Sequence, residues 1–204
     1  MLETKARIAV LVGPKSSGSN MANLILAGRD GRMFAEVVLV IAPKGEAPSI
    51  SHAQSLGVEV AIENPDEAHY DERLFKHFER HQVDLICLAG FLRLLPVPIL
   101  EAFPNRVLNI HPALLPLHGG KGMYGKRVHE AVLSAHERES GCTVHFVSDA
   151  YDSGQRILQL RCPVLEEDTP ETLGARVLAL EHQAYPEAVN QVLAHGSELN
   201  SRTP

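Results

Sequence analysis

An asparagine and a histidine stand two residues apart at the end of a predicted strand, in the segment Asn109-Ile110-His111-Pro112. Alternate residues of a strand face the same side, so we expect the side chains of Asn109 and His111 to point together. An amide N–H can stabilise an oxyanion, and an imidazole can take up or release a proton. The pair indicates an active site or, equally well on spacing alone, a polar strand end held by hydrogen bonds.

Carboxylates follow another predicted strand, in the segment from Asp149 to Gly154, which also contains Asp152. A carboxylate here could orient an imidazole and raise its pKa. Asp and Gly are also common turn residues, and spacing alone favours a plain turn. His145 lies on the strand itself, where a histidine is more often a structural residue than a catalyst. None of the other histidines has the spacing of paired metal ligands.

A Gly- and Ser-rich loop, residues 13–20, lies between a predicted strand and a predicted helix. Such a loop presents backbone N–H groups and a helix N-terminus, which both suit an anion. It matches neither G-x-G-x-x-G nor G-x-x-x-x-G-K-[ST]. The alternative is a simple turn in which Ser19 or Asn20 caps the helix.

The segment 88–96 runs from a predicted strand through Gly90 into an apolar stretch with one arginine, Arg93. It could form a flat apolar pocket whose backbone groups bind a heterocycle. The alternative is a loop that only covers the end of the strand.

Short apolar runs alternate with amphipathic segments along the chain, which is typical of a parallel sheet covered by helices. Strands are predicted at 8–12, 36–42, 58–62, 84–91, 106–111, 143–148 and 156–164, and helices at 20–27, 51–56, 65–81, 97–103, 126–135 and from 169 onward. Pro186 is expected to kink or split the last helix. The pattern predicts one α/β domain over residues 1–204: a doubly wound, mostly parallel sheet with helices on both faces and a late antiparallel extension. Residues 1–7 and 197–204 are expected to be frayed ends.

The composition is that of an ordinary globular protein, with 45% hydrophobic and 22% charged residues and a net charge of −6. The acidic balance disfavours a nucleic-acid partner, because phosphates need clustered Lys and Arg. Three separated cysteines provide neither a disulfide framework nor a zinc site. No signal peptide or membrane span is seen, so the cytoplasm is the expected location.

Several segments together resemble the folate-dependent formyltransferases, most closely the branch that acts on glycinamide ribonucleotide. The resemblance covers nearly the whole chain and rests on segments 18–20, 88–93, 108–116, 120–125, 143–147, 149–152, 181–182 and 185–186. The pattern Asn-x-His-Pro-x-Leu-Leu-Pro at 109–116 is specific to that superfamily. The resemblance implies transfer of a formyl group from 10-formyltetrahydrofolate to the amine of glycinamide ribonucleotide, in purine synthesis.

The resemblance also implies residue roles. The catalytic residues would be Asn109, His111 and Asp152. Substrate-binding residues would be Gly18, Ser19, Asn20, Pro112 and Glu181, and the residues that bind the folate co-substrate would be Leu92, Arg93, Leu94, Leu95 and Asp149. No metal is expected, because the formyl donor is already activated. The expected partners are the two small molecules, without nucleic acid or membrane, for a monomer or homodimer. Asp152 is expected to keep His111 largely protonated near neutral pH in the working complex.

The chain departs from the family pattern in places. The first loop is about two residues longer, which brings in Lys15 as a possible phosphate ligand, and an arginine common upstream of Tyr70 is missing. Gln155 stands where proline is usual. The resemblance also predicts a cis peptide bond between Leu115 and Pro116.

Other functions stay open at this point. A formyltetrahydrofolate hydrolase would use the same three residues with water as acceptor, but such relatives usually carry an extra domain ahead of this one. Methionyl-tRNA formyltransferases usually carry an extra domain after it. A sugar-nucleotide formyltransferase is compatible with the motifs. A non-catalytic nucleotide-binding module would be expected to lack Asn109, His111 or Asp152.

Overall fold

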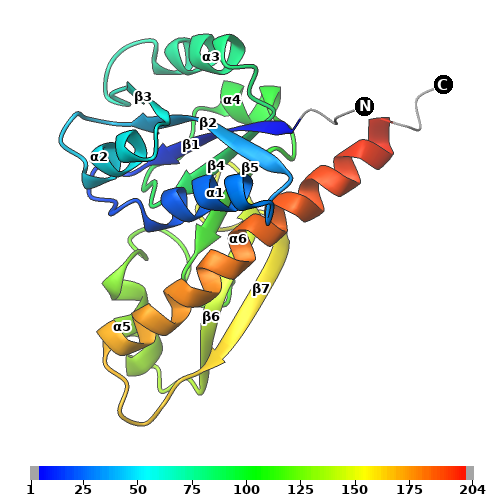
Figure 1. The fold of residues 1–204 in the computed structure, drawn as a ribbon. Helices are drawn as coiled ribbons and strands as arrows, with labels where there is room; N and C mark the ends of the chain where they lie inside the picture. The colour runs from blue at the N-terminus through cyan, green and yellow to red at the C-terminus, as the bar shows by residue number, and fades with distance from the viewer. Residues whose placement is uncertain (1–4, 201–204) are drawn as a thin grey trace.

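The computed structural model describes the backbone of residues 5–200 and the side chains of residues 5–195. Strands and helices alternate along this part of the chain (Figure 1). Their order is β1 (Ala6–Val12), α1 (Ser19–Asp30), β2 (Ala35–Ala42), α2 (Pro48–Ser55), β3 (Glu59–Ile62), α3 (Tyr70–Arg80), β4 (Leu85–Ala89), α4 (Val97–Ala102), β5 (Val107–His111), α5 (Lys126–Ser134), β6 (Glu139–Phe146), β7 (Arg156–Pro163) and α6 (Pro170–Asn200).

The strands form one seven-stranded sheet in the order β3-β2-β1-β4-β5-β6-β7. The pairs from β3 to β5 are parallel, whereas β6 pairs antiparallel with both β5 and β7. The predicted fold class and the late antiparallel extension are therefore confirmed. The chain order reverses direction between β1 and β4, so this sheet has a topological switch point there, where ligands bind in such folds.

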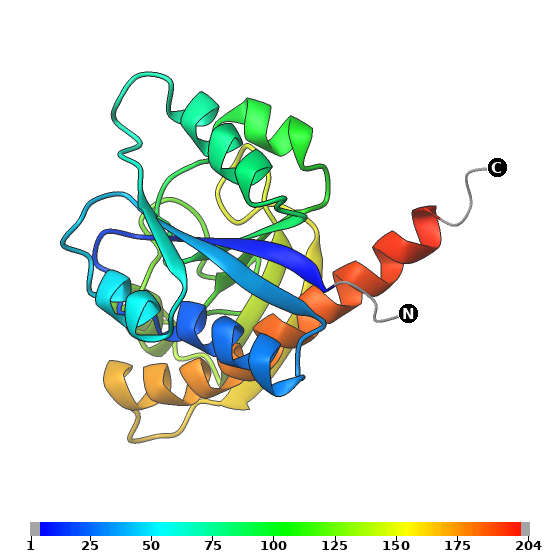
Figure 2. The ribbon, with the colours of Figure 1, turned by 45° about the horizontal axis from the view of Figure 1, so that its top comes forward.

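Helices cover both faces of the sheet, as Figures 1 and 2 show. Ile8, Val10 and Val12 of β1 belong to the core shared with α1 and α6. Ala9 and Leu11 belong to the second core, shared with α3 and α4. This alternation explains why β1 is a continuous apolar run, since a strand buried on both faces has no polar side.

Some boundaries differ from those predicted. Helix α3 begins at Tyr70 rather than at residue 65, because residues 64–69 form a turn whose carbonyls at Asn64 and Ala68 accept hydrogen bonds from Arg73. Strand β6 begins at Glu139, four residues early, because its pairing with β7 extends to Pro163.

The chain ends also differ from the prediction of frayed residues 1–7 and 197–204. Strand β1 already begins at Ala6, where it pairs with Ala35, and α6 continues to Asn200. Residues 1–4 and 201–204 lie outside the described residues. The predicted cis peptide bond between Leu115 and Pro116 is confirmed.

Helix α6 is not split at Pro186. Proline has no backbone N–H, so the carbonyl four residues earlier, that of His182, loses its helical partner. Asn23 of α1 donates a hydrogen bond from Nδ2 to that carbonyl at 2.8 Å. The helix therefore continues because a neighbouring helix supplies the donor that Pro186 lacks.

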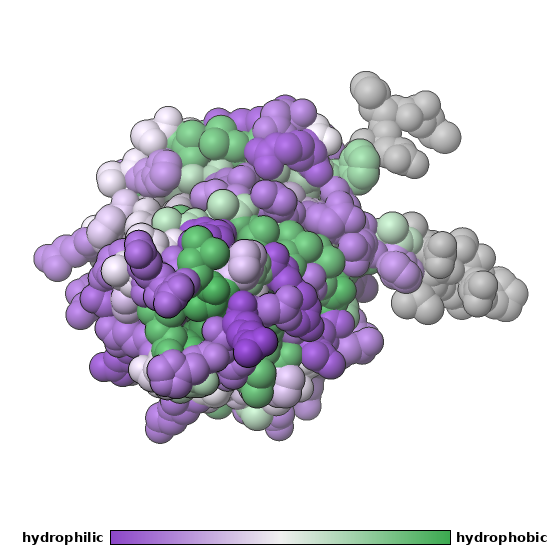
Figure 3. Space-filling model, turned by 90° about the horizontal axis from the view of Figure 1, so that it is seen from below, coloured by the Kyte–Doolittle hydropathy of each residue, from purple (hydrophilic) through white to green (hydrophobic). Residues whose placement is uncertain are grey.

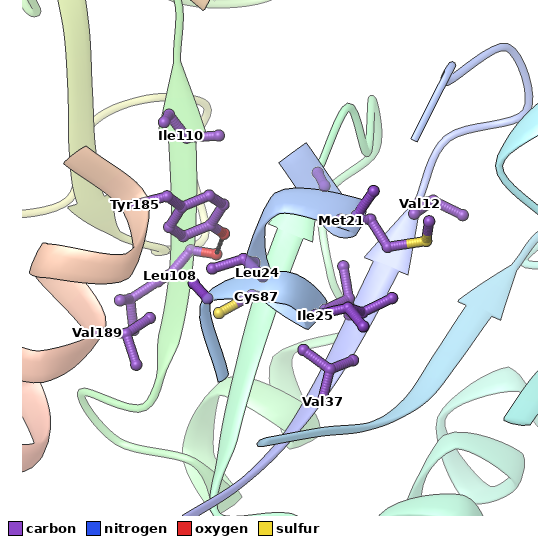
Figure 4. Close-up of a cluster of buried hydrophobic side chains, with 14 of the residues drawn as sticks. Val12, Met21, Leu24, Ile25, Val37, Cys87, Leu108, Ile110, Tyr185 and Val189 are labelled. Atoms are coloured by element: carbon purple, nitrogen blue, oxygen red, sulfur yellow. Dashed lines mark hydrogen bonds between the residues drawn. The ribbon is translucent and has the colours of Figure 1, made fainter. Parts of the chain in front are cut away.

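Tyr185 anchors α6 to strands β4 and β5 of the sheet. Its ring lies in the core beside Leu108 and Cys87 (Figure 4). Its hydroxyl lies 2.9 Å from the carbonyl of Leu88 and 3.1 Å from that of Leu108. Because Leu108 directly precedes Asn109, this contact holds the backbone on which the predicted catalytic pair stands.

The surface seen from below is mixed, with hydrophobic areas interrupted by hydrophilic residues (Figure 3). Among the described residues, no helix is both long enough and apolar enough to cross a membrane.

Candidate active site

Strand β5 ends with Asn109 and His111, and their side chains lie on the same side of the strand, as predicted. His111 is only 3% exposed. In the register of β5 with β6, Asn109 lies opposite His145 and His111 opposite Thr143. The antiparallel register therefore brings His145 of β6 beside Asn109.

Asp152 lies in that turn, with a left-handed backbone (φ 54°) that Asp tolerates better than most residues. Its Oδ2 accepts a hydrogen bond from the backbone N–H of Gly120 at 2.8 Å and lies 3.5 Å from Nδ1 of His111. Its Oδ1 lies 3.5 Å from Nε2 of His145. The turn thus brings a carboxylate against the imidazole of His111, 41 residues away along the chain.

His145 lies within this group, although the sequence favoured a structural role for it. Its side chain is 2% exposed. Its Nε2 lies 3.1 Å from Nδ2 of Asn109, and its Nδ1 lies 2.8 Å from the carbonyl of Phe146. Asn109 and His145 meet because β5 pairs antiparallel with β6. The sequence predicted only the pairing of β6 with β7, so it gave no sign of this contact.

Burial and charge act in opposite directions on His111. Burial lowers the pKa of His111 below its usual value, although the carboxylate of Asp152 and the hydrogen bond to His118 oppose this effect. In the free protein, burial therefore outweighs the effect of Asp152, and protonation of His111 in the working complex stays a prediction. Nε2 of His111 lies 2.8 Å from the carbonyl of His118, which can only accept. Neutral His111 thus carries its proton on Nε2, and its Nδ1 is a free base that faces Asp152.

Asp152 itself stays ionised. Burial works to raise the pKa of Asp152, but its contacts with the two histidine rings and the hydrogen bond from the Gly120 N–H together lower it. The site therefore holds a fixed negative charge beside a neutral imidazole.

The loop after β1 reaches helix α1 at Gly18, which has φ 82° and is the N-cap. The N–H of Gly18 lies 3.2 Å from Oγ of Ser16, so the added part of the loop already occupies one of the expected anion donors. The N–H groups of Ser19 and Asn20 lie in the first helical turn, where no intrahelical partner exists. Lys15 is exposed in the same loop, four residues before Ser19.

Glu181 of α6 lies against this loop. It is 7% exposed, and its Oε2 accepts a hydrogen bond from Nδ2 of Asn20 at 2.8 Å. Burial raises the pKa of Glu181 to about 7, against the opposing effect of that bond. The structure thus joins two of the predicted substrate-binding residues that are 161 positions apart.

The predicted folate segment follows β4. Leu92 and Leu94 are each 42% exposed, whereas Leu95 is buried. The guanidinium of Arg93 is held by both carboxylate oxygens of Asp66, at 2.6 and 2.8 Å. This pair joins the turn before α3 to the segment after β4. The sequence analysis did not predict this pair, since it expected a helix over residues 65–81.

For two further predicted residues, Asp149 and Pro112, the structure gives the exposure and the position next to the site. Asp149 is exposed in the turn after β6, three residues before Asp152. Pro112 is half-buried directly after His111.

The loops after β1 and β4 touch at the switch point. A Cβ added to Gly13 would lie 1.9 Å from the carbonyl oxygen of Gly90, so only glycine allows this approach. The first loop carries the predicted anion site and the second carries the predicted folate segment. The two expected ligands would therefore lie side by side, with the end of β5 adjacent.

An open hollow of about 1380 Å³ lies elsewhere, at the amino ends of the strands, and is lined in part by Arg7, Asp84 and Arg106. We do not assign it as the active site, because Asn109 and His111 lie toward the carboxyl end of β5. Within the described part of the chain, no group of three or more His, Cys, Asp or Glu side chains is arranged to hold a metal ion.

The fold and site define a doubly wound α/β protein with an amide, an imidazole and a carboxylate at the carboxyl end of its sheet. Residues 6–189 match the formyl transferase family, and the chain belongs to this family.

Relatives and solved structures agree with this assignment. The chain is 39% identical over 193 residues to a chloroplastic phosphoribosylglycinamide formyltransferase of Arabidopsis thaliana, covering 92% of the chain and 65% of that protein. It is 38% identical to the trifunctional purine biosynthetic protein adenosine-3 of Bos taurus, covering 95% of the chain but 19% of that protein. The glycinamide ribonucleotide transformylase 1 structure from Symbiobacterium toebii matches with a TM-score of 0.82 at 39% identity, covering 91% of this chain and 86% of that one.

Proposed function

We propose that the protein transfers a formyl group from 10-formyltetrahydrofolate to the amine of glycinamide ribonucleotide, a step of purine synthesis. The observation that carries this proposal is the convergence of Asn109, His111 and Asp152 at the end of β5. Relatives that carry the transferase name, at up to 39% identity over most of the chain, support the choice of substrates.

The proposed reaction begins with neutral His111. The substrate amine attacks the formyl carbon, and the carbonyl oxygen becomes an oxyanion that accepts a hydrogen bond from Asn109. His111 takes the proton that the amine loses, and Asp152 stabilises the imidazolium that results. His111 then gives this proton to the folate nitrogen as the carbon–nitrogen bond breaks. The products are the formylated ribonucleotide and tetrahydrofolate.

We place the ligands on either side of the switch point. The phosphate of the ribonucleotide would bind the N–H groups of Ser19 and Asn20, with Lys15 close by and Glu181 toward the sugar. The folate would lie on the exposed apolar side chains of Leu92 and Leu94. The contact between Gly13 and Gly90 supports this arrangement, because it keeps both subsites next to His111.

The test is an assay of purified protein with 10-formyltetrahydrofolate, with and without glycinamide ribonucleotide. We expect tetrahydrofolate to appear only with the ribonucleotide, in equal amount to the formylated product. Rapid release of formate without an amine would instead identify a hydrolase. Formylation of an amino sugar nucleotide in preference to glycinamide ribonucleotide would move the protein to that branch.

We further propose that residues 1–204 act as a single domain without a metal ion, as a monomer or homodimer in the cytoplasm. The reasoning for the metal is chemical, since the folate already activates the formyl group. Dialysis against a chelator should leave kcat unchanged, and a loss restored by one particular metal would contradict the proposal.

A further inference from the structure

We propose that His145 is a positioning residue that acts through Asn109: by accepting a hydrogen bond, it turns the amide so that an N–H is offered to the reacting carbonyl. This inference rests on the proposed function. Its basis is the position of a 2% exposed imidazole between two groups of the site, Asn109 at 3.1 Å and Asp152 at 3.5 Å.

The backbone determines which nitrogen of His145 carries the proton. Nδ1 lies 2.8 Å from the carbonyl oxygen of Phe146. A carbonyl can only accept, so Nδ1 must be the donor. In the neutral ring, Nε2 is then an acceptor, and it is this nitrogen that faces Asn109.

The tautomer of His145 in turn selects the orientation of the amide. With its oxygen beside Nε2, Asn109 would place two lone pairs against each other. With its nitrogen there, it donates one N–H at 3.1 Å. The amide nitrogen carries a second N–H. Within the described residues this is the one side-chain hydrogen bond of Asn109, so the second N–H is available to a ligand.

This constraint matters because an asparagine amide has two orientations of similar shape and opposite chemistry. One orientation offers a donor to an oxyanion, and the other offers an oxygen that repels it. Stabilisation of an oxyanion depends on donors that are already oriented before the reaction. His145 removes the wrong orientation without touching the substrate.

The same nitrogen of His145 also lies 3.5 Å from the carboxylate of Asp152. A protonated ring would donate to that carboxylate and could no longer accept from Asn109. Asn109 thus favours the neutral ring of His145 and Asp152 favours the protonated ring. The positioning role requires the neutral ring. Asp152 and His111 interact electrostatically with His145. Arg156 of β7 lies opposite His145 in the sheet, with its guanidinium bonded to the carbonyl of Leu115.

A double-mutant cycle tests the proposal. We expect His145→Phe to lower kcat by about ten- to one-hundredfold, less than the full loss of one oxyanion donor, with KM values nearly unchanged. In an Asn109→Ala background the same change should lower kcat by less than about twofold, since the group it orients is absent. Effects that multiply in the double variant would overturn the proposal.

Two companion variants separate positioning from folding. His145→Gln can place its amide oxygen near the position of Nε2, so it should retain kcat within about fivefold of the wild type. A loss as large as that of His145→Phe would contradict the proposal. His195→Phe changes an exposed histidine of α6 that lines the hollow at the amino ends of the strands, away from Asn109 and His111, and should leave kcat unchanged. Thermal melting of each variant identifies any that fail to fold.

Nitrogen-15 NMR of the free protein provides a readout without substrate. We expect Nε2 of His145 to show the shift of an unprotonated acceptor at neutral pH and Nδ1 that of an N–H. A protonated Nε2 would overturn the inference even if formyl transfer is observed. Conversely, an inactive wild type with the expected tautomer would count against the proposed function alone.

Discussion

At the scale of single residues, His111 illustrates how burial and charge compete. Asp152 lies 3.5 Å away and favours the cation, but a side chain so little exposed loses more from desolvation than it gains. Its pKa therefore falls, and the ring rests as a neutral base. Asp152 contributes most when the proton arrives during the reaction.

Replacing Asp152 by Asn should show this directly. We expect Asp152→Asn to lower kcat by about one hundredfold with little change in KM, because the charge acts mainly in the transition state. The carboxylate raises the pKa of His111, so its removal should move the acid limb of the kcat/KM profile to lower pH. Steady-state kinetics from pH 5 to 9 would measure both effects. Near-normal turnover over the whole pH range would show that Asp152 only forms the turn and has no role in catalysis.

Glu181 gives a prediction about stability. Its pKa is about 7 in the folded protein against 4.5 ordinarily, so the folded state loses stability as pH rises from 4.5 to 7. Glu181→Gln cannot ionise, and we expect it to melt at a higher temperature than the wild type at pH 8 and at the same temperature near pH 4. The gain in stability is at most about 3 kcal/mol. Equal melting temperatures at pH 8 would contradict the prediction.

The same variant also tests the role of Glu181 in binding. If Glu181 binds the sugar, the KM of Glu181→Gln for the ribonucleotide should be about tenfold higher than that of the wild type.

At the scale of elements, helix α6 depends on α1. Pro186 leaves the carbonyl of His182 without a helical donor, and Asn23 supplies one at 2.8 Å. This contact lets one long helix carry both Glu181 and Tyr185 at fixed positions against the sheet.

Asn23→Ala should therefore destabilise the protein by about 1–3 kcal/mol, the cost of leaving a part-buried carbonyl without a partner. Pro186→Ala restores a backbone N–H to the helix, so in that background Asn23→Ala should cost less. Urea unfolding of the two single variants and the double variant measures the difference. An equal cost in both backgrounds would mean that the Asn23 bond does not replace the missing helical one.

At the scale of the whole molecule, the site depends on the contact between two loops at the switch point. Gly13 and Gly90 bring the loops after β1 and β4 into backbone contact. The predicted phosphate and folate subsites belong to these two loops, so their spacing is set by that contact.

Gly13→Ala should disturb both subsites together. The new methyl group would lie 1.9 Å from the carbonyl oxygen of Gly90, and we expect a loss of about 1–3 kcal/mol or more and higher KM values for both substrates. Gly45→Ala is a matched control, since nothing lies within 4 Å of its added carbon. Equal stability of the two variants, measured by thermal melting, would show that the loops can separate freely.

The sequence by itself determined much of the architecture. The apolar run 8–12 predicted a strand buried on both faces, because a parallel strand covered by helices has no side exposed to solvent. Strand geometry alone was enough to place Asn109 and His111 on one side. Local patterns carry such information because it depends only on neighbouring residues.

Only the tertiary structure decided the contacts between distant segments. Whether Asp152 reaches His111, whether His145 meets Asn109 and whether Asn20 meets Glu181 depend on strand order and register, which no local pattern contains. The charge state of His111 likewise required the fold, since burial is a property of the packed molecule. The sequence identified the residue types of the site. The tertiary structure decided the charge state, because the burial of His111 and its distance from Asp152 both depend on how the segments pack.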